Sequence, residues 1–309
     1  MLYRSLSTSR QAIHQLLDRR MRLSEQVGYL LPLIAQIRGD HPTLSCRAMY
    51  AKLQPQAIGR DRFEQLCRSN GFSIARKVNL CRTTDSTGVV RFDNLLEGLA
   101  LSGINEAWSS DITYYEVNHR FYYLTFIMDC FSRRILGSAV SSRLTTEQTT
   151  LPALRQAVKA RGGTVPSQLI FHSDGGGQYY DQDFLSYTAH HQMRNSMCEF
   201  AYENGKSERL NGIIKNNYLK YYQTSTLEQL QQNVDRAVTL YNRERPHKAL
   251  HYQTPVDYEN KVVILQQQTT PTMTGSLDAK PGLNGASSPF QTEQTTPPTP
   301  GVLSANIRE

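Results

Sequence analysis

The sequence predicts an α/β fold in which helices flank a mixed five-stranded sheet and a small all-helical region precedes it. Three observations predict this fold. Apolar residues recur at helical spacing over the first 70 residues, and three runs rich in aromatic and β-branched residues follow from residue 108. Helix and strand patterns then alternate up to residue 243, as in α/β proteins.

The N-terminal region begins with a helical stretch from about Ser9 to Arg38, in which Pro32 predicts a break or kink. Two short amphipathic segments follow, around Ser45–Leu53 and Gly59–Asn70, and Gly71 can end the second. Their spacing fits a helix-turn-helix that reads DNA, and it fits an ordinary helical hairpin equally well. Both interpretations stay open.

Residues 76–107 show neither period for long and contain a turn-forming cluster at 83–88, so we expect a linker. The sheet then begins with a meander of three strands, at Trp108–Val117, Phe121–Asp129 and Ile135–Ser141. The remaining elements are expected to be, in order, helix Thr146–Arg161, strand Gln168–His172, helix Gln182–His191, strand Arg194–Cys198, helix Lys206–Tyr222 and helix Leu227–Arg243.

The composition changes beyond Val263, where prolines are scattered among Thr, Gln, Ser and Gly. Such a segment cannot bury enough apolar surface to offset its chain entropy. We therefore expect a helical region over 1–75, a linker over 76–107, a core with a C-terminal helix over 108–260, and a disordered tail over 261–309.

The net charge of +7 and the pI near 9.1 favour a polyanionic partner. The five cysteines form no CxxC pair, which argues against a zinc site and for reduced, mostly buried thiols. No apolar run is long enough to span a bilayer, and the N-terminus lacks the pattern of a signal peptide. We expect a reducing, soluble compartment and no membrane partner.

Two aspartates are oddly placed for structure alone. Asp111 lies mid-strand in WSSDITYY, where a charge is costly unless it is paired or binds a metal. Asp174 ends FHSD and precedes three glycines that permit close approach of a phosphate. A third acid between the last strand and the long helix could be Glu199, Glu203 or Glu208. We favour Glu208, because the helix places Lys215 two turns further on the same face.

Three carboxylates of this kind suit Mg²⁺ or Mn²⁺. Two such ions can activate an attacking hydroxyl and stabilise the leaving oxygen in phosphoryl transfer. Each aspartate taken singly is more often a capping or surface residue, so the prediction depends on Asp111, Asp174 and Glu208 occurring together in strand and helix contexts.

Several motifs resemble those of insertion-sequence transposases, specifically the OrfB type of the IS-three group. They are NLL, NEAWSSDITYY, YYLTFIMDCFSRRILG, HSDGGGQY, ENGKSERLNGIIK and YNRERPHKALHYQTPVDY, between about Asn94 and Asn260. The resemblance implies a ribonuclease-H-like fold, a retroviral-integrase-like core and a DDE triad at Asp111, Asp174 and Glu208. It also implies cleavage and strand transfer at the ends of a mobile element, on the nucleoid in the cytoplasm.

The sequence departs from the family pattern in two ways. Glu203-Asn204 stands where an Asp-Asn pair is usual, and the 33 residues between Asp174 and Glu208 fall slightly short of the family's usual 35. These departures leave Glu203 as the alternative third acid. The family also implies DNA as partner, a homo-oligomer on DNA, and an upstream-frame product that carries a helix-turn-helix.

Basic residues beside the acids are candidates for phosphate contact. They are Lys206, Arg209, Lys215 and Lys220 on and after the long helix, and Arg243, Arg245 and His247 in YNRERPH. Asp129 could be a fourth metal ligand, but a turn or capping role is favoured. Two rival functions are a DNA-binding protein without catalysis and a ribonuclease H or resolvase-type nuclease with the same metal chemistry.

Overall fold

The computed structural model describes residues 9–56, 58–74, 92–198 and 204–269. The chain begins with the helices α2 (Arg10–Asp40), α3 (Cys46–Leu53) and α4 (Arg60–Ser69), which confirms the predicted N-terminal helices. These helices share a core of buried residues: Leu30, Ile34, Ile37, Leu44, Ala48, Met49, Ile58, Phe63 and Cys67.

Helix α2 runs through Pro32 without a break, so of the predicted break or kink the break is wrong. A proline in a helix interior removes one main-chain hydrogen bond and strains the preceding turn. Leu30, Ile34 and Ile37 are buried on both sides of Pro32. Their burial against α3 and α4 stabilises a continuous helix by more than that loss.

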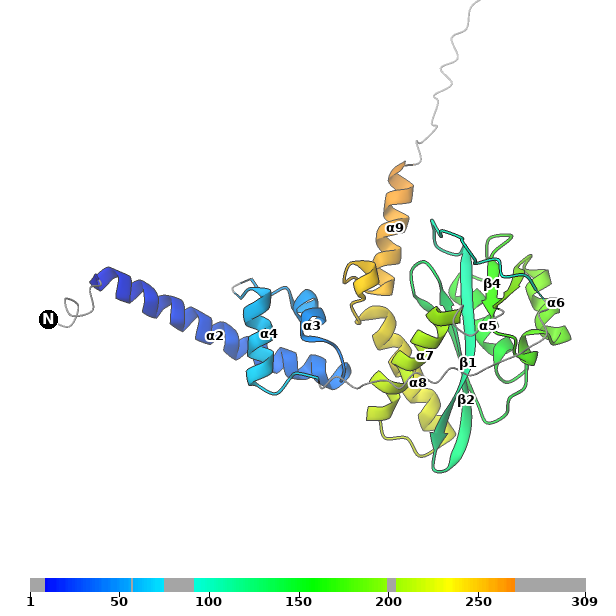
Figure 1. Cartoon of the computed structure of the whole chain (residues 1–309), viewed down its shortest axis with the longest axis horizontal. Helices are drawn as coiled ribbons and strands as arrows, with labels where there is room; N and C mark the ends of the chain where they lie inside the picture. The colour runs from blue at the N-terminus through cyan, green and yellow to red at the C-terminus, as the bar shows by residue number, and fades with distance from the viewer. Residues whose placement is uncertain (1–8, 57, 75–91, 199–203, 270–309) are drawn as a thin grey trace, which may run out of the picture. The chain divides into compact units, whose positions relative to one another are not determined.

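The sheet contains five strands, as predicted, and they lie in the order β3-β2-β1-β4-β5 (Figure 1). Its central strand β1 pairs antiparallel with β2 and parallel with β4. Strands β3 and β5 form the two edges. The strand bounds are β1 Ala107–Val117, β2 Arg120–Asp129, β3 Ile135–Ser141, β4 Ile170–Ser173 and β5 Arg194–Met197.

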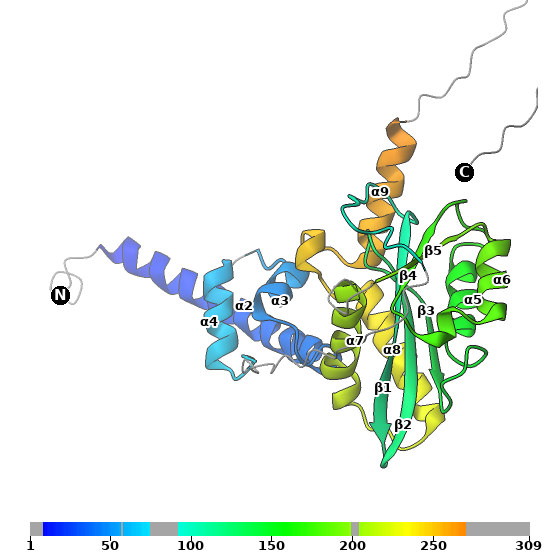
Figure 2. The ribbon, with the colours of Figure 1, turned by 45° about the vertical axis from the view of Figure 1, so that its right-hand side comes forward.

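Helices cover both faces of the sheet (Figures 1 and 2). Helices α5 (Thr150–Ala160) and α6 (Gln182–His190) lie on one face, and α7 (Gly205–Asn217) and α8 (Leu227–Arg243) lie on the other. The two-residue period of β2 divides its side chains between these layers. Leu124, Phe126 and Met128 pack with α7 and α8, whereas Ile127 packs with α5.

A last helix, α9 (Pro255–Thr269), continues past residue 260, where the sequence predicts the end of the core. The hydroxyl of Thr254 accepts a 3.1 Å hydrogen bond from the Asp257 amide and donates to its carboxylate. Thr-Pro followed by an acid is an N-terminal helix signal that our sequence analysis did not use. The predicted disordered tail lies outside the described residues from 270 onward.

Residues 92–106 belong to the predicted linker, yet they pack against the sheet. Leu95, Leu96 and Leu101 contact a small buried cluster that includes Cys130. The amide of Leu95 donates a 2.9 Å hydrogen bond to the Ser196 hydroxyl. Residues 75–91 of the same predicted linker fall outside the described ranges.

Cys67, Cys130 and Cys198 are buried and free of disulfides, in agreement with the sequence analysis. No helix in the described part of the chain is both long enough and apolar enough to cross a membrane.

Candidate active site

The pairing of β1 with β4 brings Asp111 and Asp174 to the same end of two neighbouring parallel strands. Ser109 pairs with His172 in this register. Asp111 and Asp174 each lie two residues beyond that pair, so the carboxyl end of β4 faces the middle of β1. β1 continues past this pairing to Val117 and also contacts helix α7.

The surroundings of Asp111 change the pKa of its carboxyl group. Burial, followed by the negative charges of Asp174 and Glu208, raises the pKa of Asp111 from 3.8 to about 7. Burial also raises the pKa of Asp174. Like charges held close together in a partly desolvated place destabilise one another unless a cation neutralises them. The three predicted acids therefore share one electrostatic environment.

Helix α7 is fastened to β1 by polar side chains along one of its faces. Asn204 donates from Nδ2 to the Ser110 carbonyl at 3.0 Å. Asn211, two turns further, donates from Nδ2 to Asp111 Oδ2 at 2.7 Å. Lys215 donates from Nζ to Thr113 Oγ1 at 2.6 Å. Lys215 thus points toward β1 beside Asp111, as predicted from its spacing.

The loop after β4 holds Asp174 through a short 3₁₀ turn at Gly177–Tyr179. The Gly176 amide donates to Asp174 Oδ1 at 3.3 Å, and a Cβ at Gly176 would lie only 3.1 Å from that oxygen. Tyr179 is buried, and its hydroxyl lies 2.9 Å from Ser110 Oγ. Tyr179 therefore connects the loop of Asp174 to the residue before Asp111.

Asn211 and Tyr179 were missed by sequence reasoning. Asn211 lies one turn after Glu208, on the side of α7 that faces β1. A polar residue between the apolar positions Leu210 and Ile214 of a buried helix is the signal that could have found it. Tyr179 carries no such signal, because an aromatic residue after a strand is most often part of a core.

The donor set fits a divalent metal ion. Within the described ranges, no three side chains of His, Cys, Asp and Glu converge closely enough to hold an ion as they stand. Yet the carboxylates of Asp111, Asp174 and Glu208 are hard oxygen donors, and burial, followed by the charges of Asp174 and Glu208, raises the pKa of Asp111. The side-chain oxygen of Asn211 is also buried without a hydrogen-bond partner. Glu199 and Glu203, the alternative third acids, lie outside the described residues.

Asp129 does not face this site. Its carboxylate accepts hydrogen bonds from the amides of Asn105 at 2.7 Å, Phe131 at 3.0 Å and Ser132 at 2.8 Å. It also lies 3.5 Å from the Arg161 guanidinium. Asp129 therefore closes a turn and pairs with an arginine, which confirms the favoured capping role over metal ligation.

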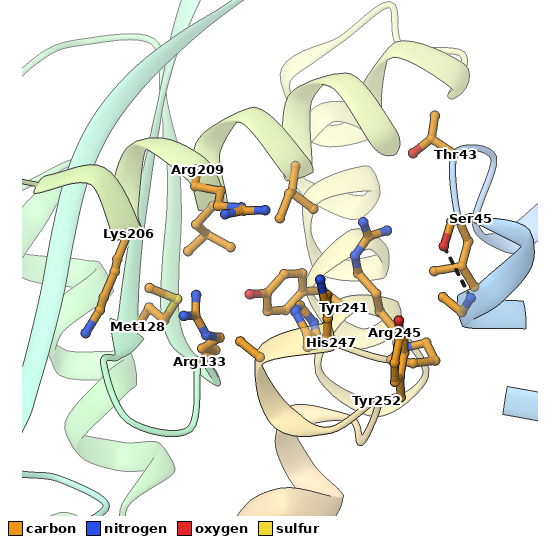
Figure 3. Close-up of a pocket in the computed structure, with 17 residues that line it drawn as sticks. Thr43, Ser45, Met128, Arg133, Lys206, Arg209, Tyr241, Arg245, His247 and Tyr252 are labelled. Carbon is orange, nitrogen blue, oxygen red and sulfur yellow. Dashed lines mark hydrogen bonds between the residues drawn. The ribbon is translucent and has the colours of Figure 1, made fainter. Parts of the chain in front are cut away.

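The predicted phosphate-binding residues fall into separate places. Four of them line one cavity between α7 and the loop after α8: Lys206, Arg209, Arg245 and His247 (Figure 3). Arg209 also lines a neighbouring cavity with Glu208 and Lys220. Burial, then Arg245 and Arg133, lower the pKa of His247 to about 3, so this side chain is neutral at physiological pH. Lys215 and Arg243 line neither cavity.

Comparison with known proteins finds matches to integrase core domains along the sheet and the helices that follow it. Two models, both described as "Integrase core domain", match residues 102–202 and 192–255. Together they cover the sheet, α7, α8 and the start of α9.

Two curated relatives match this chain along much of its length. It is 28% identical to the "Insertion element IS600 uncharacterized 31 kDa protein" of Shigella sonnei over 235 residues, which are 74% of this chain and 85% of that protein. It is 31% identical to "Transposase InsF for insertion sequence IS3A" of Escherichia coli (strain K12) over 173 residues, which are 55% of this chain and 59% of InsF.

Solved integrase structures are more distant. The HTLV-2 integrase catalytic core domain, in complex with magnesium, has a TM-score of 0.42 and 24% identity over 50% of this chain and 96% of that chain. A chain of the simian T-cell lymphotropic virus intasome in complex with a PP2A regulatory subunit has a TM-score of 0.44 and 19% identity, over 82% of this chain and 80% of its own length.

The sheet order and the family matches define the class: this chain carries an integrase core domain. The chain is similar in sequence to the IS3A transposase and to the IS600 protein, and a helical N-terminal region precedes its five-stranded sheet. Dependence on a divalent metal is a general property of such cores.

Proposed function

We propose that this protein is a DNA transposase of the DDE type, which cleaves the ends of an insertion sequence and joins them to target DNA. The observation that carries the proposal is the raised pKa of Asp111. Burial and then the negative charges of Asp174, after β4, and Glu208, on α7, contribute to that shift, which supports a shared role for the three acids. Such a site is arranged for metal ions and a phosphate rather than for stability.

Asp111, Asp174 and Glu208 would hold Mg²⁺ or Mn²⁺, two ions per site. Bound metal would supply activation of the attacking hydroxyl and stabilisation of the leaving oxygen. The protein's own residues keep this geometry. Asn211 orients the Asp111 carboxylate, and Lys215, 2.6 Å from Thr113 Oγ1, adds positive charge beside it for an incoming phosphate.

The N-terminal helices are proposed to bind DNA in addition to the core. Helix α4 buries Phe63 and Cys67 and exposes Arg60, Arg62 and Arg68. Replacing Arg62 and Arg68 by Gln should weaken binding to duplex DNA in a mobility-shift assay. Unchanged binding would favour the ordinary helical hairpin.

The partners we propose are DNA ends and target DNA, further copies of this chain assembled on DNA, and a product of an upstream frame. Action on DNA would place the protein on the nucleoid in the cytoplasm. Co-purification with element-end DNA, followed by light scattering, measures how many copies assemble.

The decisive experiment measures strand transfer by the full-length protein. A labelled element-end duplex with a free 3′-OH is incubated with target DNA and Mg²⁺ or Mn²⁺. Asp111→Asn, Asp174→Asn and Glu208→Gln should each abolish cleavage and transfer while DNA binding in EDTA persists. Glu147→Gln, which changes an exposed acid outside the site, is the matched control.

The products of this experiment distinguish strand transfer from the two alternative functions. Cleavage without joining would favour the nuclease alternative, and DNA binding without metal-dependent chemistry would favour the non-catalytic one. If Glu208→Gln alone keeps near-normal turnover, Glu203→Gln becomes the test of the third acid.

A further inference from the structure

A cavity of about 660 Å³ lies between helix α7, the turn that joins β2 to β3, and the loop after α8 (Figure 3). Its lining includes five basic side chains and no acidic one: Arg133, Lys206, Arg209, Arg245 and Lys248. We call it the arginine cavity. These cations come from three segments far apart in the sequence, namely the turn after β2, helix α7 and the loop after α8, so the fold, and not a local run of charge, brings them together.

Within the described part of the chain, none of the five cations forms an ion pair. Lys206 donates only to the Cys130 carbonyl, at 3.4 Å. Arg245 lies over the Tyr218 ring, 6.0 Å from its centroid, and its Nη1 is buried without a hydrogen-bond partner. By contrast, Arg134 and Arg161 are both paired with Glu259.

The guanidinium groups are close enough to act on the same neighbour. The charges of Arg245, Arg133 and Arg209 all help burial to lower the pKa of His247. Like charges gathered beside a buried histidine raise the energy of the protein unless an anion joins them. An acidic ligand would remove that cost, and none of the residues that line the cavity is acidic.

Arg133 is placed by an unusual backbone. Its φ of 61° lies in the left-handed region, which a residue with a long side chain seldom adopts. The hydrogen bond from its amide to the Asp129 carbonyl, 2.8 Å long, holds the turn. Figure 3 shows the Arg133 side chain directed toward the cavity, near those of Tyr241 and His247. Strained backbone of this kind is often kept where it positions a functional group.

The arginine cavity adjoins the cavity that contains Glu208. Arg209 and Ile213 line both this cavity and the neighbouring one that contains Glu208. Arg209 and Glu208 are adjacent in α7. A DNA strand bound in the arginine cavity would therefore pass within one helical turn of Glu208.

We propose that the arginine cavity binds the phosphodiester backbone of a DNA strand as that strand runs toward Glu208. The inference rests on the proposed action on DNA and adds a second anchoring point, remote from Asp111. An arginine guanidinium group can donate two parallel hydrogen bonds to phosphate oxygens, and such contacts do not depend on the base sequence. The cavity thus fixes the position of the strand and leaves sequence recognition to other parts.

The test measures binding of the full-length protein to a random-sequence duplex in EDTA, at several salt concentrations. Arg133→Asn and Arg245→Gln remove one charge each, and Asn tolerates the left-handed backbone at 133. Each should weaken binding by on the order of tenfold and reduce the slope of log K against log salt by about 0.9. Lys248→Gln, on an exposed side chain, should act in the same direction without affecting folding.

Two controls separate the cavity from net charge and from misfolding. Lys159→Gln also removes one exposed charge, but from α5 on the opposite face of the sheet, so its slope should match that of the unmodified protein. Arg245→Lys keeps the charge and should retain most of the affinity.

Slopes for the cavity variants equal to that of Lys159→Gln would overturn the proposal. So would a thermal-shift result in which inorganic phosphate stabilises the unmodified protein but not the variants while DNA isotherms stay unchanged, because the cavity would then bind free anions only. All these binding measurements are made without metal. Unchanged DNA binding in the cavity variants would therefore not affect the strand-transfer result. Loss of catalysis in the Asp111, Asp174 or Glu208 variants would likewise not affect the binding result.

Discussion

Asn211 Nδ2 donates a 2.7 Å hydrogen bond to Asp111 Oδ2, and this bond ties helix α7 to the central strand at the first acid of the site. Asn211 is only 4% exposed, so its amide is not available to solvent as an alternative partner. The bond fixes one carboxylate oxygen of Asp111.

Asn211→Ala should therefore lower strand-transfer activity by roughly 10–100-fold, the usual cost of losing a residue that orients a metal ligand. The Mn²⁺ concentration needed for half-maximal activity should rise as well. Asn233→Ala is the matched control, because Asn233 Nδ2 bonds only loop atoms before α8, at the Gln223 carbonyl and Thr224. An unchanged metal requirement in Asn211→Ala would show that the residue does not orient Asp111.

The second prediction concerns the pH dependence of stability in the metal-free protein. The pKa of Asp111 is raised from 3.8 to about 7 by burial and by Asp174 and Glu208. The folded state therefore binds more protons than the unfolded state between these values, and the free energy of unfolding falls as pH rises from about 4 to about 7. A shift of this size corresponds to at most about 4 kcal/mol.

Asp111→Asn removes this loss, so the variant should be more stable than the unmodified protein at pH 8 and nearly equal to it at pH 4. Urea unfolding in EDTA at both pH values measures the difference. Added Mg²⁺ should stabilise the unmodified protein and not the variant. A variant that is less stable at pH 8 would mean that Asp111 has a structural role instead.

Much of the fold could be predicted from the sequence because its strands differ so clearly from its helices. Aromatic and β-branched residues in β1 and β2 reproduce the strands nearly to the residue, and α8 begins and ends where its apolar period does. Helix α9 was not found, because Val263, Ile264 and Leu265 are exposed and show no single buried face.

The site could be predicted only in part. Asp111 and Asp174 stand out because a charge inside a strand and a charge before three glycines are locally anomalous. The roles of Asn211 and Tyr179 depend on contacts with residues 100 and 69 positions away, which no local pattern reports. The arginine cavity could not be predicted for the same reason, because Arg133 and Arg245 line one cavity only in the folded chain.

Gly137 in β3 provides a third prediction. A Cβ at this position would collide with the main-chain oxygen of Ala153 and lie 3.0 Å from the Ala157 nitrogen, both in α5. These are backbone atoms, so α5 would have to move away from the sheet. Gly137→Ala should destabilise the protein by about 1–3 kcal/mol, as overpacking of a core does.

Gly28→Ala is the opposite control. No atom lies within 4 Å of a Cβ there, and Gly28 is inside helix α2. Alanine should stabilise that helix by up to about 1 kcal/mol. Thermal melts followed by circular dichroism should show a lower melting temperature for Gly137→Ala and a higher one for Gly28→Ala. Equal melting temperatures would refute the packing argument at Gly137.

The last prediction concerns Glu259, which attaches α9 to the core. Its side chain is buried, and its carboxylate accepts from Arg161 Nη1 and Nη2 at 2.8 and 2.6 Å, from Arg134 at 2.6 Å, and from the Ser132 hydroxyl at 2.6 Å. Burial alone would raise the pKa of Glu259, but these hydrogen bonds outweigh it and lower the pKa. The stabilisation is therefore present above about pH 4.5 and is lost as pH falls below it.

Glu259→Ala leaves Arg161 without its main partner in a place that is largely closed to water. The cost should be about 3–5 kcal/mol at neutral pH, the range for breaking a buried ion pair from one side. Glu147→Ala, at an exposed acid, should change stability by less than about 0.5 kcal/mol. Hydrogen exchange should show that amides of α9 lose protection in Glu259→Ala before those of β1 and β2 do. Uniform loss across the sheet would mean that Glu259 supports the whole core and not the attachment of α9.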